Sequence, residues 1–154
     1  MLSEHEFLQQ RLQMVRRQLH TAEHDVVYDG QGRGRKATIA DEVNQENSYK
    51  REARLLAHIL AVTQEGQVER ALQQWRATFG AHLADHRARH KAAFDEDDAW
   101  WSLPPHERQR VPKPPRPPQA IYIDQSGQEW VITDAFLLLL DDLRERLARW
   151  LADD

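Results

Sequence analysis

Three histidines at four-residue spacing are the residues of this sequence best suited to chemistry. His82, His86 and His90 repeat at i, i+4 and i+8 in a segment whose apolar pattern predicts a helix. Side chains four residues apart on a helix point the same way, so two imidazoles can reach one divalent metal ion. The preferred interpretation is instead that His86 and His90 extend an apolar helix face as partly buried, hydrogen-bonded side chains. We expect no cofactor, with a divalent metal at these histidines as the alternative.

A second candidate site is a group of cations beside glycines. Arg33, Arg35 and Lys36 fall within four residues of a glycine-rich segment. Such a tip could contact a phosphate backbone, and a second basic run with Arg108 and Arg110 could add contacts. The formal net charge is −4, however, and no helix shows a face rich in arginine and lysine. A nucleic-acid-binding regulator is therefore one alternative function, and a helical metal-binding protein that uses His82, His86 and His90 is the other.

Signatures of catalysis are absent from the sequence. It contains no cysteine, and none of its serines lies in a Gly-x-Ser-x-Gly turn. The glycines of residues 30–34 match neither a Walker A loop nor a dinucleotide fingerprint. The pairs Asp97/Asp98 and Asp141/Asp142 are adjacent in sequence, so on a helix they point about 100° apart and suit paired acid–base work poorly. The expectation leans to a protein that is not an enzyme, with metal-dependent chemistry at the histidines as the open alternative.

The prolines divide the chain into a long and a short part. All seven lie between Pro104 and Pro118. Proline fixes φ and removes an N–H donor, so the stretch 103–119 is predicted to contain no helix and to run extended over the surface. It is either a strap over the protein's own Trp100 and Trp101, which is preferred, or a ligand for an aromatic-lined groove.

Helices are predicted on both sides of this stretch. Ser3 and Glu6 form a capping box, and a helix should follow to about His24. Residues 25–39 are predicted to form a basic hairpin or loop, because Val26, Val27 and Tyr28 favour a strand. A second helix should end near Gly66, and a third should run from about Gln67 to Phe94.

After the prolines the sequence predicts a hairpin and a last helix. Ile121 and Ile123 alternate with Tyr122 and Asp124, a turn surrounds Gly127, and residues 130–132 return. The final helix should begin at Thr133 or Asp134. The fold class is α+β, mainly helical, with about four helices and one or two short antiparallel β-hairpins. One domain of residues 1–154 is expected, with a helical body (1–103), the proline strap (104–119) and a hairpin–helix unit (120–154).

Two apolar seams with heptad spacing suggest where helices pack. The first consists of Leu8, Leu12, Val15, Leu19 and Ala22, and the second of Phe136, Leu140, Leu143, Leu147 and Trp150. We expect the terminal helices to pack on each other through these seams, which together with the tryptophans would supply both core and interface. The residues assigned to this interface are Leu8, Leu12, Val15, Leu19, Trp100, Trp101, Leu143, Leu147 and Trp150.

Composition suits a soluble globular chain, with 40% hydrophobic and 30% charged residues. The first residues lack the pattern of a signal peptide and no apolar run is long enough to span a bilayer, so we expect a cytoplasmic protein with no membrane partner. The predicted function is a small interaction or accessory protein, a subunit of a larger assembly or a homo-oligomer. Its partner would be another protein or a second copy of the chain.

Overall fold

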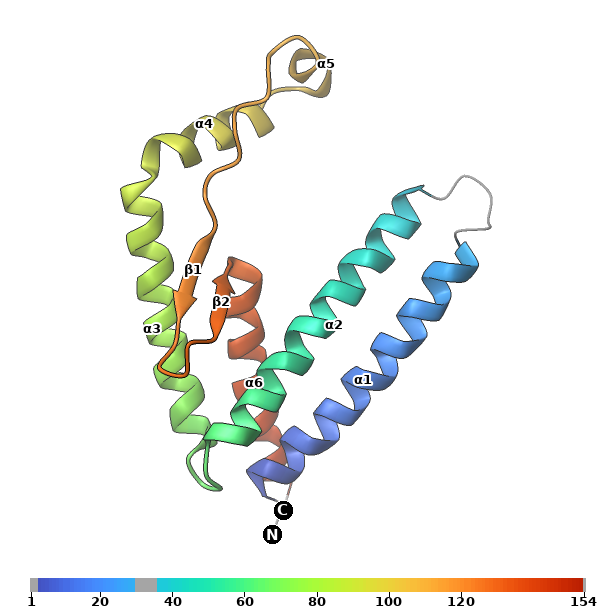
Figure 1. Cartoon of the computed structure of the whole chain (residues 1–154), viewed down its shortest axis with the longest axis vertical. Coiled ribbons are helices and arrows are strands. Elements are labelled where there is room, and N and C mark those ends of the chain that lie inside the picture. Colours follow the sequence, from blue (N-terminus) through green and yellow to red (C-terminus); the bar gives the residue numbers. More distant parts are fainter. Residues whose placement is uncertain (1–2, 30–35, 154) are drawn as a thin grey trace. The chain divides into compact units, whose positions relative to one another are not determined.

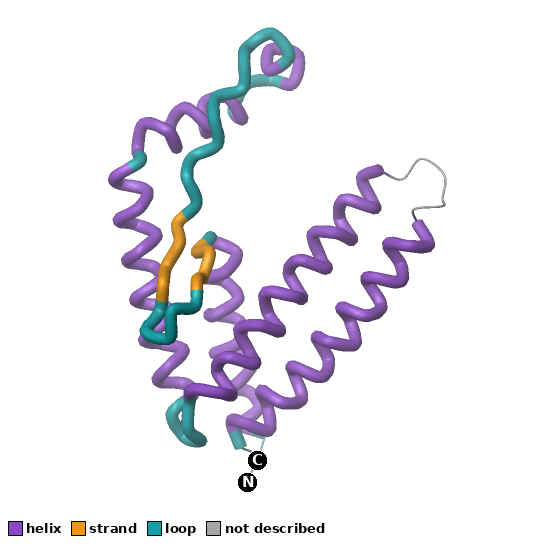
Figure 2. The backbone as a smooth tube through the Cα atoms, in the orientation of Figure 1, coloured by secondary structure: helices purple, strands orange, loops and turns teal. Residues whose placement is uncertain are grey.

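The computed structural model describes the backbone of residues 3–29 and 36–153, and the side chains of residues 3–20 and 47–153. Across these residues the chain is mainly helical with one two-stranded antiparallel sheet, which confirms the predicted fold class (Figures 1 and 2). The elements are α1 (Glu4–Asp29), α2 (Lys36–Val62), α3 (Val68–Arg89), α4 (Lys91–Trp101), α5 (Pro105–Arg108), β1 (Ala120–Ile123), β2 (Glu129–Ile132) and α6 (Asp134–Ala152). None of the described helices is both long and apolar enough to cross a membrane.

Backbone contacts divide the chain into two compact units. Unit 1 comprises Met1–Leu72 and Asp142–Asp154, and unit 2 comprises Gln73–Asp141. The boundary between the units falls within α3 and within α6, so each of these two helices contributes residues to both units.

Unit 1 is built around α1 and α2, which lie side by side and antiparallel (Figure 1). Ser3 caps α1 as predicted, because the backbone N–H of Glu6 donates to Ser3 Oγ at 3.0 Å, which is one of the two hydrogen bonds of a capping box. The ends of α1 and α6 also meet, with the rings of Phe7 and Trp150 5.9 Å apart and Trp150 Nε1 donating to the Ser3 carbonyl at 3.1 Å. The fully buried apolar side chains of this unit are Leu8, Val15, Leu55, Leu56, Ile59, Val68, Leu72, Leu143 and Leu147.

The two strands of the hairpin predicted within residues 25–39 are wrong, because both segments are helical. Residues 26–28 lie in α1 and residues 36–39 lie in α2. Strand propensity is weak, spanning about 1 kcal/mol, whereas extending an existing helix by one residue costs little, so Val26, Val27 and Tyr28 continue the helix. The turn of that hairpin, residues 30–35, lies outside the described residues.

The third predicted helix is interrupted. The stripe of Val68, Leu72, Phe79 and Leu83 is buried as expected. However, α3 ends at Arg89, His90 leaves helical geometry at φ −115° and ψ 31°, and α4 begins at Lys91. The described residues thus contain six helices where about four were predicted.

The proline-rich stretch contains one helical turn, although it was predicted to contain none. Helix α5 starts at Pro105, where the missing N–H of proline is tolerated because first-turn N–H groups have no helical partner. The segment from Pro112 to Gln119 has no helix or strand and leads into β1 (Figure 2).

The second predicted hairpin is confirmed. Strands β1 and β2 pair antiparallel with Ala120 opposite Ile132 and Ile121 opposite Val131. Gly127 closes the turn with φ +84°, a conformation that side chains disfavour. Thr133 then caps α6, because its Oγ1 accepts the N–H of Phe136 at 3.1 Å.

Candidate protein-interaction surface

The inner face of the β1–β2 hairpin packs on the helices of unit 2. The ring of Tyr122 lies 5.2 Å from that of Phe79, and the ring of Trp130 lies 6.0 Å from that of Phe136. Trp130 and Ile132 are each only 2% exposed. These side chains therefore serve the core of the unit.

The opposite face of the hairpin carries three exposed β-branched side chains, which we call the outer hairpin face: Ile121, Ile123 and Val131. They are 44%, 62% and 41% exposed. Ile121 lies directly opposite Val131 in the strand register, and Ile123 follows Ile121 on the same face. A solvated sheet face normally carries polar side chains, so this face has the composition of one that is covered.

The turn of the hairpin is organised by the carboxylate of Asp124. Its Oδ1 accepts the N–H of Ser126 at 2.9 Å, the hydroxyl of Ser126 at 2.6 Å and the N–H of Gln128 at 3.0 Å. Its Oδ2 accepts the indole N–H of Trp130 at 2.9 Å. These hydrogen bonds hold the pKa of Asp124 well below its ordinary value of 3.8, and those from the side chains of Ser126 and Trp130 have the largest effect.

We expect Asp124 to make the stability of the hairpin depend on acid. Since the pKa is lower in the folded state, the contribution is complete above the ordinary pKa and is lost as the pH falls below about 4. In Asp124→Asn, the free energy of unfolding should therefore fall less steeply with acid than in the wild type. Urea unfolding from pH 7 downward measures this slope. Asp98→Asn, an exposed acid of α4, controls for charge, and an unchanged slope in Asp124→Asn would contradict the assignment.

Two of the three spaced histidines hold the chain that enters β1. His86 Nε2 lies 2.6 Å from the carbonyl oxygen of Pro118, and His82 Nε2 lies 2.9 Å from that of Ile121. A carbonyl oxygen only accepts, so each Nε2 is the N–H donor. His86 is 8% exposed, as expected for a partly buried, hydrogen-bonded histidine.

The three histidines make different contacts in the structure. His90 lies between α3 and α4, and its ring centroid is 4.6 Å from that of His86. The Nε2 atom of His82 and the Nε2 atom of His86 are each hydrogen-bonded to a backbone carbonyl oxygen. Among the described side chains, those of residues 3–20 and 47–153, no group of three His, Asp or Glu residues is arranged to hold a metal ion.

The proline-rich segment is also held beside α4. Trp100 Nε1 donates to the carbonyl oxygen of Val111 at 3.0 Å. The Arg108 guanidinium and the Lys113 ammonium lie 5.4 Å and 5.1 Å from the ring centroid of Trp101. Trp101 itself remains 52% exposed. The segment thus contacts the paired tryptophans through cations as well as through its backbone.

A groove of about 540 Å³ lies within unit 2, between the ends of α3 and α6, helix α4 and the proline-rich segment. Arg87 and Asp134 pair across it at 2.7 Å, and this hydrogen bond lowers the pKa of Asp134. The groove is lined by Leu83, His86, Arg87, Phe94, Asp97, Trp101, Lys113, Arg116, Pro117, Pro118, Gln119, Ala120, Val131, Ile132, Thr133, Asp134 and Ala135. Its lining is mixed, with aromatic and aliphatic side chains beside three cations and two carboxylates.

Most of the predicted seam residues are buried inside unit 1. Leu8, Val15, Leu143 and Leu147 are fully buried, and Leu12 is 7% exposed. Leu19 and Trp150 are half-buried. Packing within the chain is therefore enough to explain the heptad spacing of these apolar residues. Of the predicted interface residues, Trp101 is the most exposed large side chain.

The predicted nucleic-acid contacts are only partly described. Arg33 and Arg35 lie outside the described residues, and Lys36 is the first residue of α2. Arg108 lies over the ring of Trp101, and Arg110 is exposed after α5. Of the two basic runs, the structure therefore describes the side chains of the second, Arg108 and Arg110.

The outer hairpin face was missed at the sequence level, although a signal was present. Both alternating sets of β1 and β2 contain apolar residues, with Tyr122 and Trp130 on one face and Ile121 and Val131 on the other. A strand that is apolar on both faces is typical of a sheet covered twice. Comparisons with protein-family models, with curated proteins and with solved structures gave no significant match.

Proposed function

We propose that this protein is a non-enzymatic interaction or accessory protein, which acts as a subunit of a larger assembly or as a homo-oligomer. The observation that carries this proposal is the outer hairpin face. Ile121, Ile123 and Val131 lie together on one face of a two-stranded sheet, whose opposite face packs on the helices of unit 2.

The outer hairpin face leaves apolar side chains in water, which favours a partner that covers them. A two-stranded sheet is marginal alone and gains stability from a third strand or from packing. Covering exposed β-branched side chains gains about 25 cal/mol per Å² of apolar surface. Trp101 and Val111 are also exposed in the same unit, by 52% and 44%, and tryptophan is enriched at protein interfaces.

Nucleic-acid binding remains the alternative. It rests on Arg33, Arg35 and Lys36, with Arg108 and Arg110 as secondary contacts. Binding that weakens steeply with salt and disappears when the first three are neutralised would favour it.

The proposal predicts an assembly that depends on the outer hairpin face. Native mass spectrometry of untagged wild-type protein should show a multiple of the 18.1 kDa chain or a stoichiometric complex with another chain. Ile121→Thr/Val131→Thr keeps the β-branched shape but exposes hydroxyl groups, and should release the 18.1 kDa monomer. The matched control is Val62→Thr, the same change at a residue of unit 1 that is 55% exposed.

A second measurement detects a partner protein that dissociates during purification. A photo-crosslinking amino acid at Val131, introduced in the native cell, should give one discrete adduct whose partner peptide is identified by mass spectrometry. The same amino acid at the exposed Ala84 of α3 should give none. A wild-type monomer without a discrete adduct at Val131 would refute the proposed function.

A further inference from the structure

The segment 112–120 shows a three-residue period in exposure. Pro114 and Pro117 are half-buried and Ala120 is buried, whereas the residues between them are exposed. Three residues per turn is the period of polyproline II, the conformation that proline-rich chains favour. One row of this segment therefore faces the unit and two rows face outward.

The two ends of the segment are fixed to the helices of unit 2. The carbonyl oxygen of Val111 accepts from Trp100 Nε1 at 3.0 Å, and that of Pro118 accepts from His86 Nε2 at 2.6 Å. The segment is thus ordered before any partner arrives. A ligand already held in its bound conformation loses less conformational entropy on binding.

The outward rows have the composition that aromatic-lined grooves recognise. One row is Pro112, Pro115 and Pro118, and the next contains Lys113 and Arg116, all exposed. We call residues 112–118 the proline ridge. Grooves that bind polyproline II segments take prolines in a fixed three-residue register. Residues 104–119 hold four cations and one acid, so a groove bordered by carboxylates complements this segment in charge.

We propose that the proline ridge docks into a partner domain whose groove is lined by aromatic side chains and bordered by carboxylates. This inference rests on the proposed function, since it names the class of one protein partner. The hydrogen bonds of the strap with Trp100 and His86 use its backbone, and the ammonium of Lys113 also lies over the ring of Trp101. The residues of both outward rows are nevertheless exposed, so holding the segment and presenting it are compatible.

The test uses the full chain against a panel of purified SH3 and WW domains, with binding followed by calorimetry. At least one domain should bind. Pro112→Ala/Pro115→Ala, which removes outward rings, and Lys113→Glu/Arg116→Glu, which reverses the cationic row, should each weaken that binding by about tenfold or more. Matched controls are Pro105→Ala in α5 and the exposed Arg110→Glu, which should bind like the wild type. Circular dichroism verifies that every variant is folded.

Three outcomes would overturn the ridge proposal: no domain of the panel binds, the controls weaken binding as much as the ridge variants, or single-stranded RNA binds in a way that only the charge reversal abolishes. The proposed function is judged separately, by the adduct at Val131. An adduct there together with unchanged binding in the ridge variants would remove the ridge and leave the interaction function standing.

Discussion

Glu52→Ala should lower the free energy of unfolding by about 3 kcal/mol, the lower end of the range for breaking a buried ion pair. Glu52 on α2 accepts from Arg11 on α1 through both oxygens, at 2.8 Å from Nε and 3.0 Å from Nη2. The side chains are only 8% and 15% exposed. The hydrogen bond to Glu52 raises the pKa of Arg11 in the wild type. In the variant this bond is absent, but arginine stays charged in proteins, so a charged guanidinium is left without this carboxylate.

The control for this prediction removes both charges. Arg11→Met/Glu52→Leu replaces the pair by apolar side chains of similar length, and such replacements of buried pairs are often neutral or stabilising. Urea unfolding followed by circular dichroism measures all three proteins. A loss below about 1 kcal/mol in Glu52→Ala, the value typical of exposed pairs, would show that solvent screens this bond.

The local features of the fold could be predicted from the sequence. The serine cap at Ser3, the buried stripe from Val68 to Leu83 and the hairpin around Gly127 each depend on neighbours within about four residues. The same local reasoning failed at Val26, where strand propensity lost to helix extension, and at Pro105, where proline begins a helix instead of preventing one.

The candidate interaction surface was less predictable from the sequence, because its hydrogen bonds and ring contacts join residues that are distant in the sequence. The spacing of His82 and His86 places them on one face, but it cannot show that Ile121 and Pro118, more than thirty residues away, supply the acceptors. The alternation in β1 likewise does not say which face meets the helices. Tyr122 packs on Phe79, and Ile121 is left outside.

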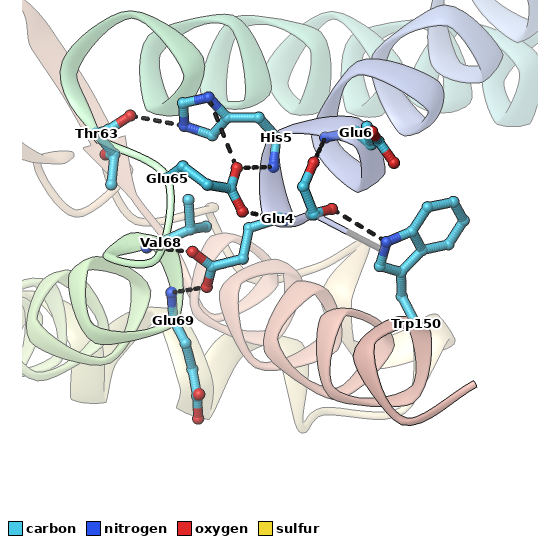
Figure 3. A network of polar contacts seen from close by, with 9 residues as sticks. Glu4, His5, Glu6, Thr63, Glu65, Val68, Glu69 and Trp150 are labelled. Carbon is cyan, nitrogen blue, oxygen red and sulfur yellow. Dashed lines mark hydrogen bonds and ion pairs between the residues drawn. The ribbon is translucent and has the colours of Figure 1, made fainter. Parts of the chain in front are cut away.

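The least predictable contact is an exchange of caps between two helices of unit 1 (Figure 3). The Glu4 carboxylate, at the start of α1, accepts the N–H groups of Val68 and Glu69 at the start of α3, at 3.2 and 3.1 Å. The Glu65 carboxylate accepts the N–H groups of Glu4 and His5 at 2.7 and 2.9 Å. Each glutamate therefore places negative charge at the positive end of a helix distant in sequence.

Glu4→Ala should lower the free energy of unfolding by about 3 kcal/mol, since hydrogen bonds to a charged group contribute about 1.5 kcal/mol or more each. Glu4 is 5% exposed, and the N–H of Val68 lies in the fully buried part of unit 1, so water replaces the carboxylate poorly. Glu4→Gln retains one acceptor oxygen and should lose about half as much. Urea unfolding at neutral pH measures these differences.

Glu65→Ala is the matched comparison, because it also removes two capping bonds. The Glu65 side chain is 48% exposed, and Ser3 Oγ still caps α1 at Glu6. The loss should therefore be about 1 kcal/mol, typical of a helix cap in contact with water. Burial, not the number of hydrogen bonds, then sets the order of the two variants. A larger loss in Glu65→Ala than in Glu4→Ala would show that the start of α1 depends on the exchange more than the start of α3 does.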